Sequence, residues 1–327
     1  MPGRPNVEIE VRLSESDDLR SMGREVRRGL TSTPKRLPSK YFYDERGSAL
    51  FEKITELPEY YLTRAEQALL EASARAVARL TGFEELVELG SGSAKKTRVL
   101  IDAGLAEGSL RRFLPVEVSV ETAERTARAM AANYPGLEVH AVVGDFEQDL
   151  HGLPGAGNRL VAFLGSTIGN FPGEQAGRLL GKIAGLVGPD GWFLLGTDLV
   201  KERTTLEAAY NDAQGVTAEF NANILNVVNS RLGGDFDTRR FEHVAFYNGE
   251  AERIESYLRA RERHTVRLRG IDLDVSLDEG EMIHTEVSCK YRRSSVESIL
   301  ARAGMTMHHW FTDVEETFAL SLSRKTR

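Results

Sequence analysis

The chain has almost no cysteine, since Cys289 is the only one among its 327 residues. A single cysteine excludes an internal disulfide and a cysteine-rich zinc site. Because Cys289 lies in an apolar, β-prone run, we expect it to be a small core residue.

Long apolar runs are missing as well. No segment reaches the roughly 18 to 20 apolar residues that a membrane helix needs, and Met1-Pro2-Gly3-Arg4-Pro5 leads into charged sequence instead of a signal core. We therefore expect a cytoplasmic protein with no membrane partner. An excess of positive charge is also absent: the formal net charge of -7 opposes attraction to phosphate backbones, so we expect no nucleic-acid partner.

Strand-like apolar runs alternate with helical periods through the middle of the chain. Five such β units separated by helices predict an α/β fold, a doubly wound parallel sheet that binds its ligand beyond the carboxyl ends of the strands. The predicted strands are 86–89, 113–118, 137–143, 160–164 and 192–197, and the predicted helices are 96–103, 121–133 and 174–187. A capping box from Thr63 to Glu66 is expected to open a further helix that ends at Gly82.

Residues 201–280 interrupt this rhythm with a helical stretch and then a charged, irregular part, as an insertion does. After it we expect a strand over 283–291, a helix over 295–304 and two closing strands over 305–311 and 318–323. The predicted sheet domain is 63–200 with 283–327, and a second, substrate-binding domain is 20–62 with 201–282. Residues 1–19 are expected to form a mobile N-terminal arm.

A glycine turn, Gly90-Ser91-Gly92, follows the first predicted strand where a helix would begin. Glycines there let the backbone approach a ligand closely. A dinucleotide fingerprint would have a third glycine where Lys95 stands, so S-adenosylmethionine (SAM), which lacks a pyrophosphate, fits better. A turn with only a structural role is the alternative for this motif taken alone.

Further polar residues follow successive predicted strands. Glu117 is placed to accept ribose hydroxyls, Asp145 to accept from the adenine amino group, and Phe146 to cover the base. Lys96, just past the glycines, is placed to meet the cofactor carboxylate. Each has an ordinary structural alternative, but their joint occurrence favours a SAM site. Asn170, after the fourth strand, carries a donor and an acceptor where a substrate would react; an Asx turn before Pro172 is its alternative.

Four longer motifs resemble the EgtD family, the histidine-specific N-alpha-methyltransferases of ergothioneine biosynthesis. The resemblance runs from about Leu37 to near the C-terminus, and the strand pair at the end of the sheet resembles that of class I SAM-dependent methyltransferases with a Rossmann-like fold. The motifs are YFYDERGSALF at 41–51, LPEYY at 57–61, GSTIGN at 165–170 and TEVSCK at 285–290.

The resemblance implies three methyl transfers from SAM to the α-amine of L-histidine, giving hercynine and S-adenosylhomocysteine, with no metal. We also expect a monomer. By motif, the cofactor residues are Gly90, Lys96, Glu117, Asp145 and Phe146; the substrate carboxylate residues are Asn170 and Tyr210; the imidazole residues are Tyr60, Glu286 and Ser288; and Tyr43 lies near the amine as the candidate catalytic residue.

Glu286 and Ser288 are two residues apart on a predicted strand, so both side chains leave the same face and can meet one ring. Two positions depart from the family pattern. Glu117 stands where the family usually has Asp, and Ser256 stands where a larger methionine lies near the imidazole. The second departure puts the packing around the ring in question.

Three other functions compete with this interpretation. A methyltransferase of the same fold could act on another amino acid or amine such as tryptophan or tyrosine. A nicotinamide dehydrogenase is disfavoured because the third fingerprint glycine is absent. A noncatalytic sensor would bind the cofactor and transfer nothing.

Overall fold

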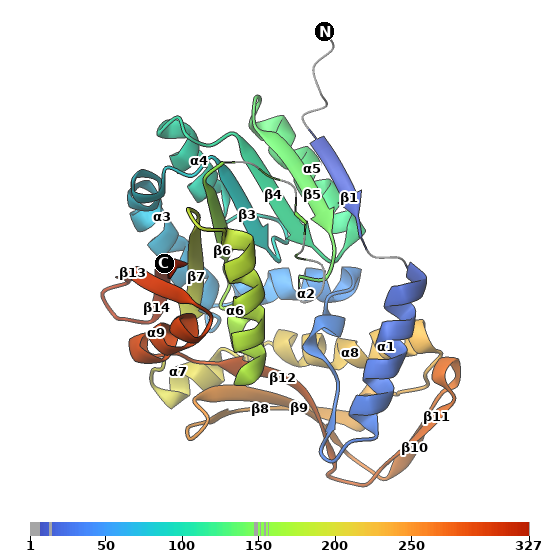
Figure 1. The fold of residues 1–327 in the computed structure, drawn as a ribbon. Coiled ribbons are helices and arrows are strands. Elements are labelled where there is room, and N and C mark those ends of the chain that lie inside the picture. The colour runs from blue at the N-terminus through green and yellow to red at the C-terminus, as the bar shows by residue number, and fades with distance from the viewer. Residues whose placement is uncertain are drawn as a thin grey trace. The chain divides into compact units, whose positions relative to one another are not determined.

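The chain divides into two compact units in a computed structural model, which describes residues 7–12, 15–146, 150, 152–153, 155 and 157–326, without the side chains of 15–17. Unit 1 comprises Met1–Leu13, Leu62–Val200 and Tyr291–Arg327. Unit 2 comprises Ser14–Tyr61 and Lys201–Lys290. Figure 1 labels their helices and strands.

Unit 1 is built on a mixed sheet with helices packed against it (Figure 1). Its strands are β1 (Val7–Val11), β3 (Glu85–Leu89), β4 (Arg112–Glu117), β5 (Glu138–Val143), β6 (Arg159–Phe163), β7 (Trp192–Asp198), β13 (Met305–Thr312) and β14 (Phe318–Lys325). Its helices are α3 (Leu62–Thr81), α4 (Arg98–Ala106), α5 (Val120–Asn133), η2 (Thr167–Asn170), α6 (Glu174–Val187) and α9 (Arg293–Arg302).

The strand order in the described residues is β1-β5-β4-β3-β6-β7-β14-β13, and β14 runs antiparallel to both of its neighbours. From β3 the chain moves outward through β4 and β5, then returns to β6 on the other side of β3. Because crossovers between parallel strands are right-handed, α4 and α5 cover one face and α6 the other. The order reverses between β3 and β6, the position at which doubly wound sheets bind ligands. The predicted doubly wound class I architecture is confirmed.

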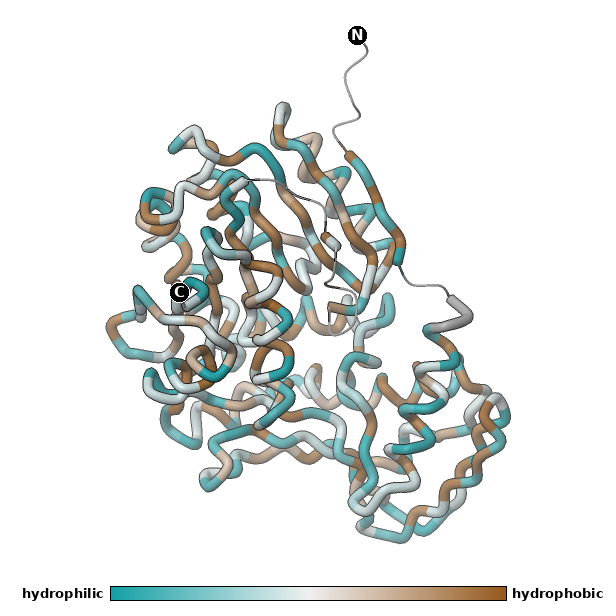
Figure 2. The backbone as a smooth tube through the Cα atoms, in the orientation of Figure 1, coloured by the Kyte–Doolittle hydropathy of each residue, from teal (hydrophilic) through white to brown (hydrophobic). Residues whose placement is uncertain are grey.

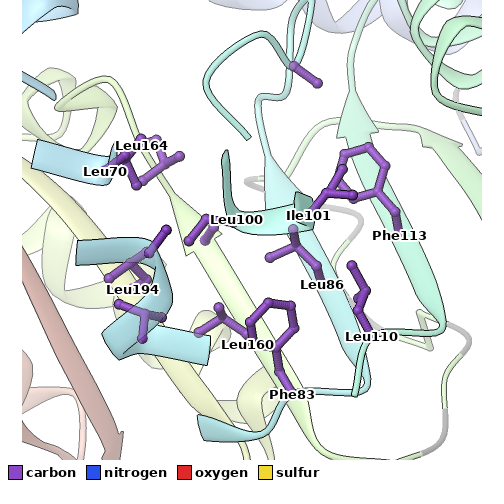
Figure 3. Packing of buried hydrophobic residues seen from close by; sticks show 14 of the residues in the cluster. Leu70, Phe83, Leu86, Leu100, Ile101, Leu110, Phe113, Leu160, Leu164 and Leu194 are labelled. Carbon is purple, nitrogen blue, oxygen red and sulfur yellow. The ribbon is translucent and has the colours of Figure 1, made fainter. Parts of the chain in front are cut away.

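The core of unit 1 lies between the sheet and its helices. All residues of β3 and β7 are buried, as expected for strands covered on both faces. Figure 3 shows Leu86, Ile101 and Phe113 in this cluster, and Figure 2 shows how apolar residues recur along the strands. Among the described helices, none is long and apolar enough to cross a membrane.

Unit 2 combines helices with a smaller sheet of order β2-β12-β9-β8 and a separate β10-β11 pair. Its strands are β2 (Lys35–Arg36), β8 (Phe241–Asn248), β9 (Arg253–Ala260), β10 (His264–Leu268), β11 (Leu273–Leu277) and β12 (Met282–Cys289). Its helices are α1 (Glu15–Leu30), η1 (Ser39–Phe42), α2 (Glu45–Glu56), α7 (Arg203–Ala208), α8 (Val216–Leu232), η3 (Thr238–Arg240) and η4 (Arg269–Ile271). β12 pairs antiparallel with β9 along almost its whole length.

Two expectations about the N-terminal part are wrong. The predicted arm over 1–19 contains β1, which pairs in parallel with β5, and the start of α1; residues 1–6 and 13–14 lie outside the described residues. As an edge strand, β1 alternates apolar residues with acids and has no continuous apolar run, so its sequence is less distinctive than those of the buried strands. The expected capping box is also wrong, because the carboxylate of Glu66 bonds the backbone of Gly165 and the side chain of Lys96 instead.

Three expectations about the later part also need correction. Residues 283–290 belong to unit 2, since β12 pairs with β9 and β2. The expected irregular stretch within 201–280 contains the hairpin β8-β9 and the pair β10-β11. Cys289 is only partly buried and is not a full core residue.

Candidate functional site

The glycine turn of unit 1 has the conformation that a close ligand approach needs. Gly90 and Gly92 have φ values of +70° and +50°, in the left-handed region that favours glycine. A Cβ atom at Gly90 would lie 3.6 Å from the Phe146 ring, and that ring packs at 5.4 Å against Phe163. The structure therefore brings the predicted cofactor residues Gly90 and Phe146 together. Asp145, which precedes the ring, is 8% exposed.

Glu117 ends β4 and receives three backbone hydrogen bonds. Its Oε2 accepts from the N–H of Gly92 at 2.9 Å, and its Oε1 accepts from Val118 at 2.9 Å and Ser119 at 3.2 Å. A carboxylate offers about four acceptor directions. Accepting both ribose hydroxyls, as predicted, would require Glu117 to release one of these backbone bonds.

Lys96 forms an ion pair with Glu66, whose side chain is fully buried in α3. The other oxygen of Glu66 accepts from the Gly165 N–H at 2.7 Å. Gly196 on β7 leaves the room for this carboxylate, because a Cβ atom there would collide with it. Glu66 thus links the predicted cofactor lysine to the turn that follows β6.

A second acid, Glu88, is buried on β3 two residues before Gly90. The Thr97 hydroxyl donates to one oxygen, and the other has no partner among the described residues. Desolvation raises the pKa of Glu88 to about 8, outweighing the opposing effects of Thr97 and Lys96. Glu88 therefore binds a proton at neutral pH.

Asn170 ends η2, in the turn that follows β6. Ser166 in this turn has φ +54°, and its Oγ accepts from the Asp198 N–H at 2.9 Å. The Tyr291 hydroxyl donates to the Ile168 carbonyl at 3.2 Å. These contacts fix the backbone that carries Asn170, whose side chain is partly exposed.

Aromatic rings of unit 2 form a continuous row. Tyr43 meets Phe51 edge-on at 5.7 Å, Phe51 meets Tyr60 at 6.2 Å, and Tyr60 meets Tyr210 at 6.3 Å. Edge-to-face contacts at these separations are favourable. Two predicted substrate residues, Tyr60 and Tyr210, and the candidate catalytic residue Tyr43 therefore lie in one row.

The row ends at a buried polar cluster on β12 and just after it. The Tyr210 hydroxyl donates to Ser288 Oγ at 2.8 Å. Lys290 donates to Ser288 Oγ at 2.9 Å and to Tyr210 Oη at 3.1 Å, and its ammonium lies 4.9 Å from the centre of the Tyr210 ring. Ser288 and Lys290 are 4% and 3% exposed. Tyr210, predicted to bind the substrate carboxylate, thus contacts the predicted imidazole residue Ser288.

Glu286 lies on the same strand, opposite Ser256 of β9. The Ser256 hydroxyl donates to Glu286 Oε2 at 3.4 Å. Desolvation raises the pKa of Glu286 to about 7, while Lys290 and Ser256 oppose the rise. Ser256 therefore donates a hydrogen bond to Glu286, the acid predicted to bind the imidazole ring.

A second layer supports these side chains. His243 hydrogen-bonds the Tyr210 carbonyl at 2.9 Å and the Asn221 amide at 2.8 Å. The Asn221 carbonyl oxygen accepts from the Thr285 hydroxyl at 2.7 Å, at the irregularity in β12 just before Glu286. Desolvation lowers the pKa of His243, so its ring is neutral at physiological pH.

Each unit thus gathers its own predicted residues, and the roles assigned to them stay predictions. Sequence reasoning missed Glu66, Glu88 and Lys290. Lys290 had a usable signal, because its spacing from Glu286 and Ser288 continues the period of two along a strand. Glu66 had none, since its partners are distant in sequence. No group of three or more potential metal-ligating side chains occurs among the described residues.

Comparison with known proteins gives concordant results. The model of the family "Histidine-specific methyltransferase, SAM-dependent" matches residues 22–325. The histidine N-alpha-methyltransferase of Mycobacterium tuberculosis is 48% identical over 98% of this chain and 99% of its own length. That of Mycolicibacterium smegmatis is 48% identical over 93% and 94%. Ergothioneine biosynthesis protein 1 of Neurospora crassa is 30% identical over 90% of this chain, which spans 34% of that protein.

Proposed function

We propose that this chain, which belongs to the family of SAM-dependent histidine-specific methyltransferases, methylates the α-amine of L-histidine three times. The products are hercynine and S-adenosylhomocysteine, and the reaction is a step of ergothioneine biosynthesis. The observation that supports this substrate most directly is the pair Glu286 and Ser288 on one face of β12, beside Tyr210.

This pair suits an imidazole ring. The Glu286 carboxylate accepts a ring N–H, and the Ser288 hydroxyl bonds the other ring nitrogen. An indole or phenol would leave a buried polar group without a partner, which costs about 1 to 3 kcal/mol and gives roughly tenfold or greater discrimination. Tyr60 packs between Phe51 and Tyr210 and bounds the ring site.

The residues of unit 1 fit a SAM molecule. The left-handed turn at Gly90 and the Phe146 ring beside it offer close backbone approach and an aromatic contact. Two residues before the turn, Glu88 has a buried oxygen with no partner among the described residues. Gly90, Lys96, Glu117, Asp145 and Phe146 would hold it. When bound, SAM supplies a methyl group activated by the adjacent sulfonium charge.

The remaining residues orient the amine and provide a route for its proton. An ammonium has no lone pair, so each transfer requires a neutral amine. Asn170 would bind the substrate carboxylate. Tyr210, predicted for the same role, donates its hydroxyl to Ser288 and would reach the carboxylate only by giving up that bond, so we assign the carboxylate to Asn170. Tyr43, or a water that it holds, would provide the route by which the proton leaves the amine. The Tyr43 and Phe51 rings would stabilise the trimethylated cation by about 0.5 to 2 kcal/mol.

We also propose that the chain acts as a cytoplasmic monomer on free histidine. Its predicted ligands are small metabolites, and the predicted residues of each ligand group lie mainly within one unit. Light scattering of the purified protein tests the monomer, and fractionation of the source cells tests the compartment.

The decisive experiment incubates the purified protein with SAM and L-histidine and follows the mass of the amino acid. Histidine should gain three methyl groups. Tryptophan and tyrosine, run in parallel, should gain none. Methylation of tryptophan or tyrosine in place of histidine would overturn the proposal and select the related methyltransferase, while bound SAM without any transfer would select the sensor.

A further inference from the structure

Lys290 is a buried cation to which the proposed reaction assigns no role. It follows β12 directly, is 3% exposed, and donates to the oxygens of Ser288 and Tyr210. An ammonium has three donors and no acceptor. Every hydrogen bond it makes therefore dictates that the partner oxygen acts as an acceptor.

This constraint determines the direction of the Ser288 hydroxyl. Lys290 occupies the acceptor side of the Tyr210 oxygen, which leaves the Tyr210 hydrogen for Ser288. Ser288 Oγ then accepts from both Tyr210 and Lys290, and a hydroxyl oxygen has two lone pairs. What Ser288 still offers a ligand is its own hydrogen, so it is a donor.

We propose that Lys290 is a positioning residue that holds Ser288 as a donor and thereby makes the site bind histidine with a neutral imidazole ring in a single tautomer. This inference rests on the proposed function. A donor at Ser288 requires a ring nitrogen with a lone pair, so the other nitrogen carries the hydrogen and donates it to the ionised Glu286. An imidazolium would direct an N–H at Ser288 and place a second positive charge near Lys290.

The ionisable groups around Ser288 and Lys290 favour a neutral imidazole ring in the ligand. Desolvation raises the pKa of Glu286 to about 7 against the opposing effects of Lys290 and the Ser256 hydroxyl, so Glu286 is about half ionised at neutral pH and mostly ionised above it. His243, which bonds the Tyr210 carbonyl, has a pKa lowered by burial and adds no charge at neutral pH. Binding therefore requires a deprotonated ligand ring, of pKa about 6.5, together with an ionised Glu286.

The test is nitrogen NMR of ring-labelled L-histidine bound to the full chain with S-adenosylhomocysteine. One protonated and one unprotonated ring nitrogen are expected, even near pH 6, where free histidine is mostly imidazolium. Histidine affinity should fall on the order of 100-fold between pH 7.5 and 5.5, since both groups take up a proton. Two protonated nitrogens in the bound ring, or affinity that hardly changes, would overturn the inference while leaving histidine methylation intact.

Variants separate the role of Lys290 from general stability. Lys290→Met should admit the imidazolium and reduce the pH effect to about tenfold or less. The matched control is Lys201→Met, because Lys201 also donates to a tyrosine hydroxyl, at 2.6 Å, and lies over the Tyr61 ring; it should retain the wild-type pattern.

A second variant keeps the test decisive if Lys290→Met folds poorly. Ser288→Ala removes the donor, so it should weaken the pH dependence by itself, and adding Lys290→Met should then change it less than Lys290→Met does alone. An unchanged nitrogen pattern in either single variant would contradict the inference. If wild-type protein neither binds nor methylates histidine, the proposed function fails first, and the same spectra reveal that outcome separately.

Discussion

Each unit contains a glutamate and a lysine close to its predicted ligand site, and the two pairs are arranged differently. In unit 1 the ammonium of Lys96 contacts the carboxylate of Glu66 directly. In unit 2 Lys290 donates to the hydroxyls of Ser288 and Tyr210, while Glu286 accepts from Ser256 and has a pKa of about 7.

The two arrangements show that Glu66 forms a structural ion pair, whereas Glu286 is available to a ligand. Glu66 has both oxygens engaged, by Lys96 and the Gly165 N–H, so its charge is compensated before any ligand binds. Glu286 retains acceptor capacity, and desolvation raises its pKa to about 7, so a ligand N–H that donates to it would favour its ionised form.

The largest effect on stability is expected from breaking the ion pair between Glu66 and Lys96. Glu66→Gln leaves Lys96 without its compensating carboxylate and should destabilise the fold by about 3 kcal/mol, measured by chemical denaturation. SAM affinity should fall about tenfold by calorimetry, because Lys96 and the Gly165 turn lose their common support. Adding Lys96→Met should recover part of the stability; strictly additive losses would argue that the two residues act independently.

Glu286→Gln should affect the substrate and spare the cofactor. The amide still accepts a ring N–H, but the charge-assisted part of the bond is lost, so kcat/KM for histidine should fall about tenfold or more. The dissociation constant for SAM should not change. Glu242→Gln, an exposed acid on β8, is the control and should leave both constants at their wild-type values.

The same substitution should stabilise the ligand-free fold at alkaline pH. The folded state raises the pKa of Glu286 to about 7, so ionised Glu286 destabilises the fold. Its stabilising proton is present below the unfolded pKa of about 4.3 and is lost as pH rises through 7. Glu286→Gln should therefore raise the melting temperature at pH 8 by a few degrees, and the gain should vanish near pH 4.5. A lower melting temperature at pH 8 would refute this account.

His243 provides an opposite pH dependence in the same unit. Burial lowers its pKa, so the unfolded chain binds the proton more readily and stability falls with acidification below about pH 6.5. Between pH 7.5 and 5.5 the unfolding free energy should fall more in wild type than in His243→Gln. Equal losses would mean that folding does not lower the pKa of His243.

The smallest effect is expected for an acid and a base on the surface of unit 2. Arg46 and Glu219 are 2.7 Å apart, and their side chains are 57% and 53% exposed. Solvent screens such a pair, so Glu219→Gln should change stability by no more than about 0.5 kcal/mol. A larger change in denaturation would show that exposure alone does not separate this pair from Glu66 and Lys96.

The fold of unit 1 was predictable because each buried parallel strand is a short apolar run followed by a helical period. The fold of unit 2 was harder to predict from the sequence, because β8 is partly exposed along most of its length and has no apolar run that indicates a strand. Its hairpin did carry a signal, the Asn248-Gly249 turn ahead of β9. Edge strand β1 likewise shows alternation in Val7–Val11.

The predicted site also has a part that the sequence indicates and a part that only the fold reveals. Glu286 and Ser288 could be paired from strand periodicity alone, and Gly90 from turn chemistry. The contacts of Glu66 depend on residues from other elements meeting in the fold, which local pattern does not contain. The direction of the Ser288 hydroxyl likewise requires the positions of Tyr210 and Lys290.

Gly196 determines whether Glu66 can keep its place. The space that holds the Glu66 carboxylate exists because position 196 has no side chain. A Cβ atom at 196 would lie 2.2 Å from a Glu66 oxygen, so the carboxylate would have to move. An alanine at 196 should therefore weaken the bonds of Glu66 to Lys96 and Gly165 without replacing any of the three residues.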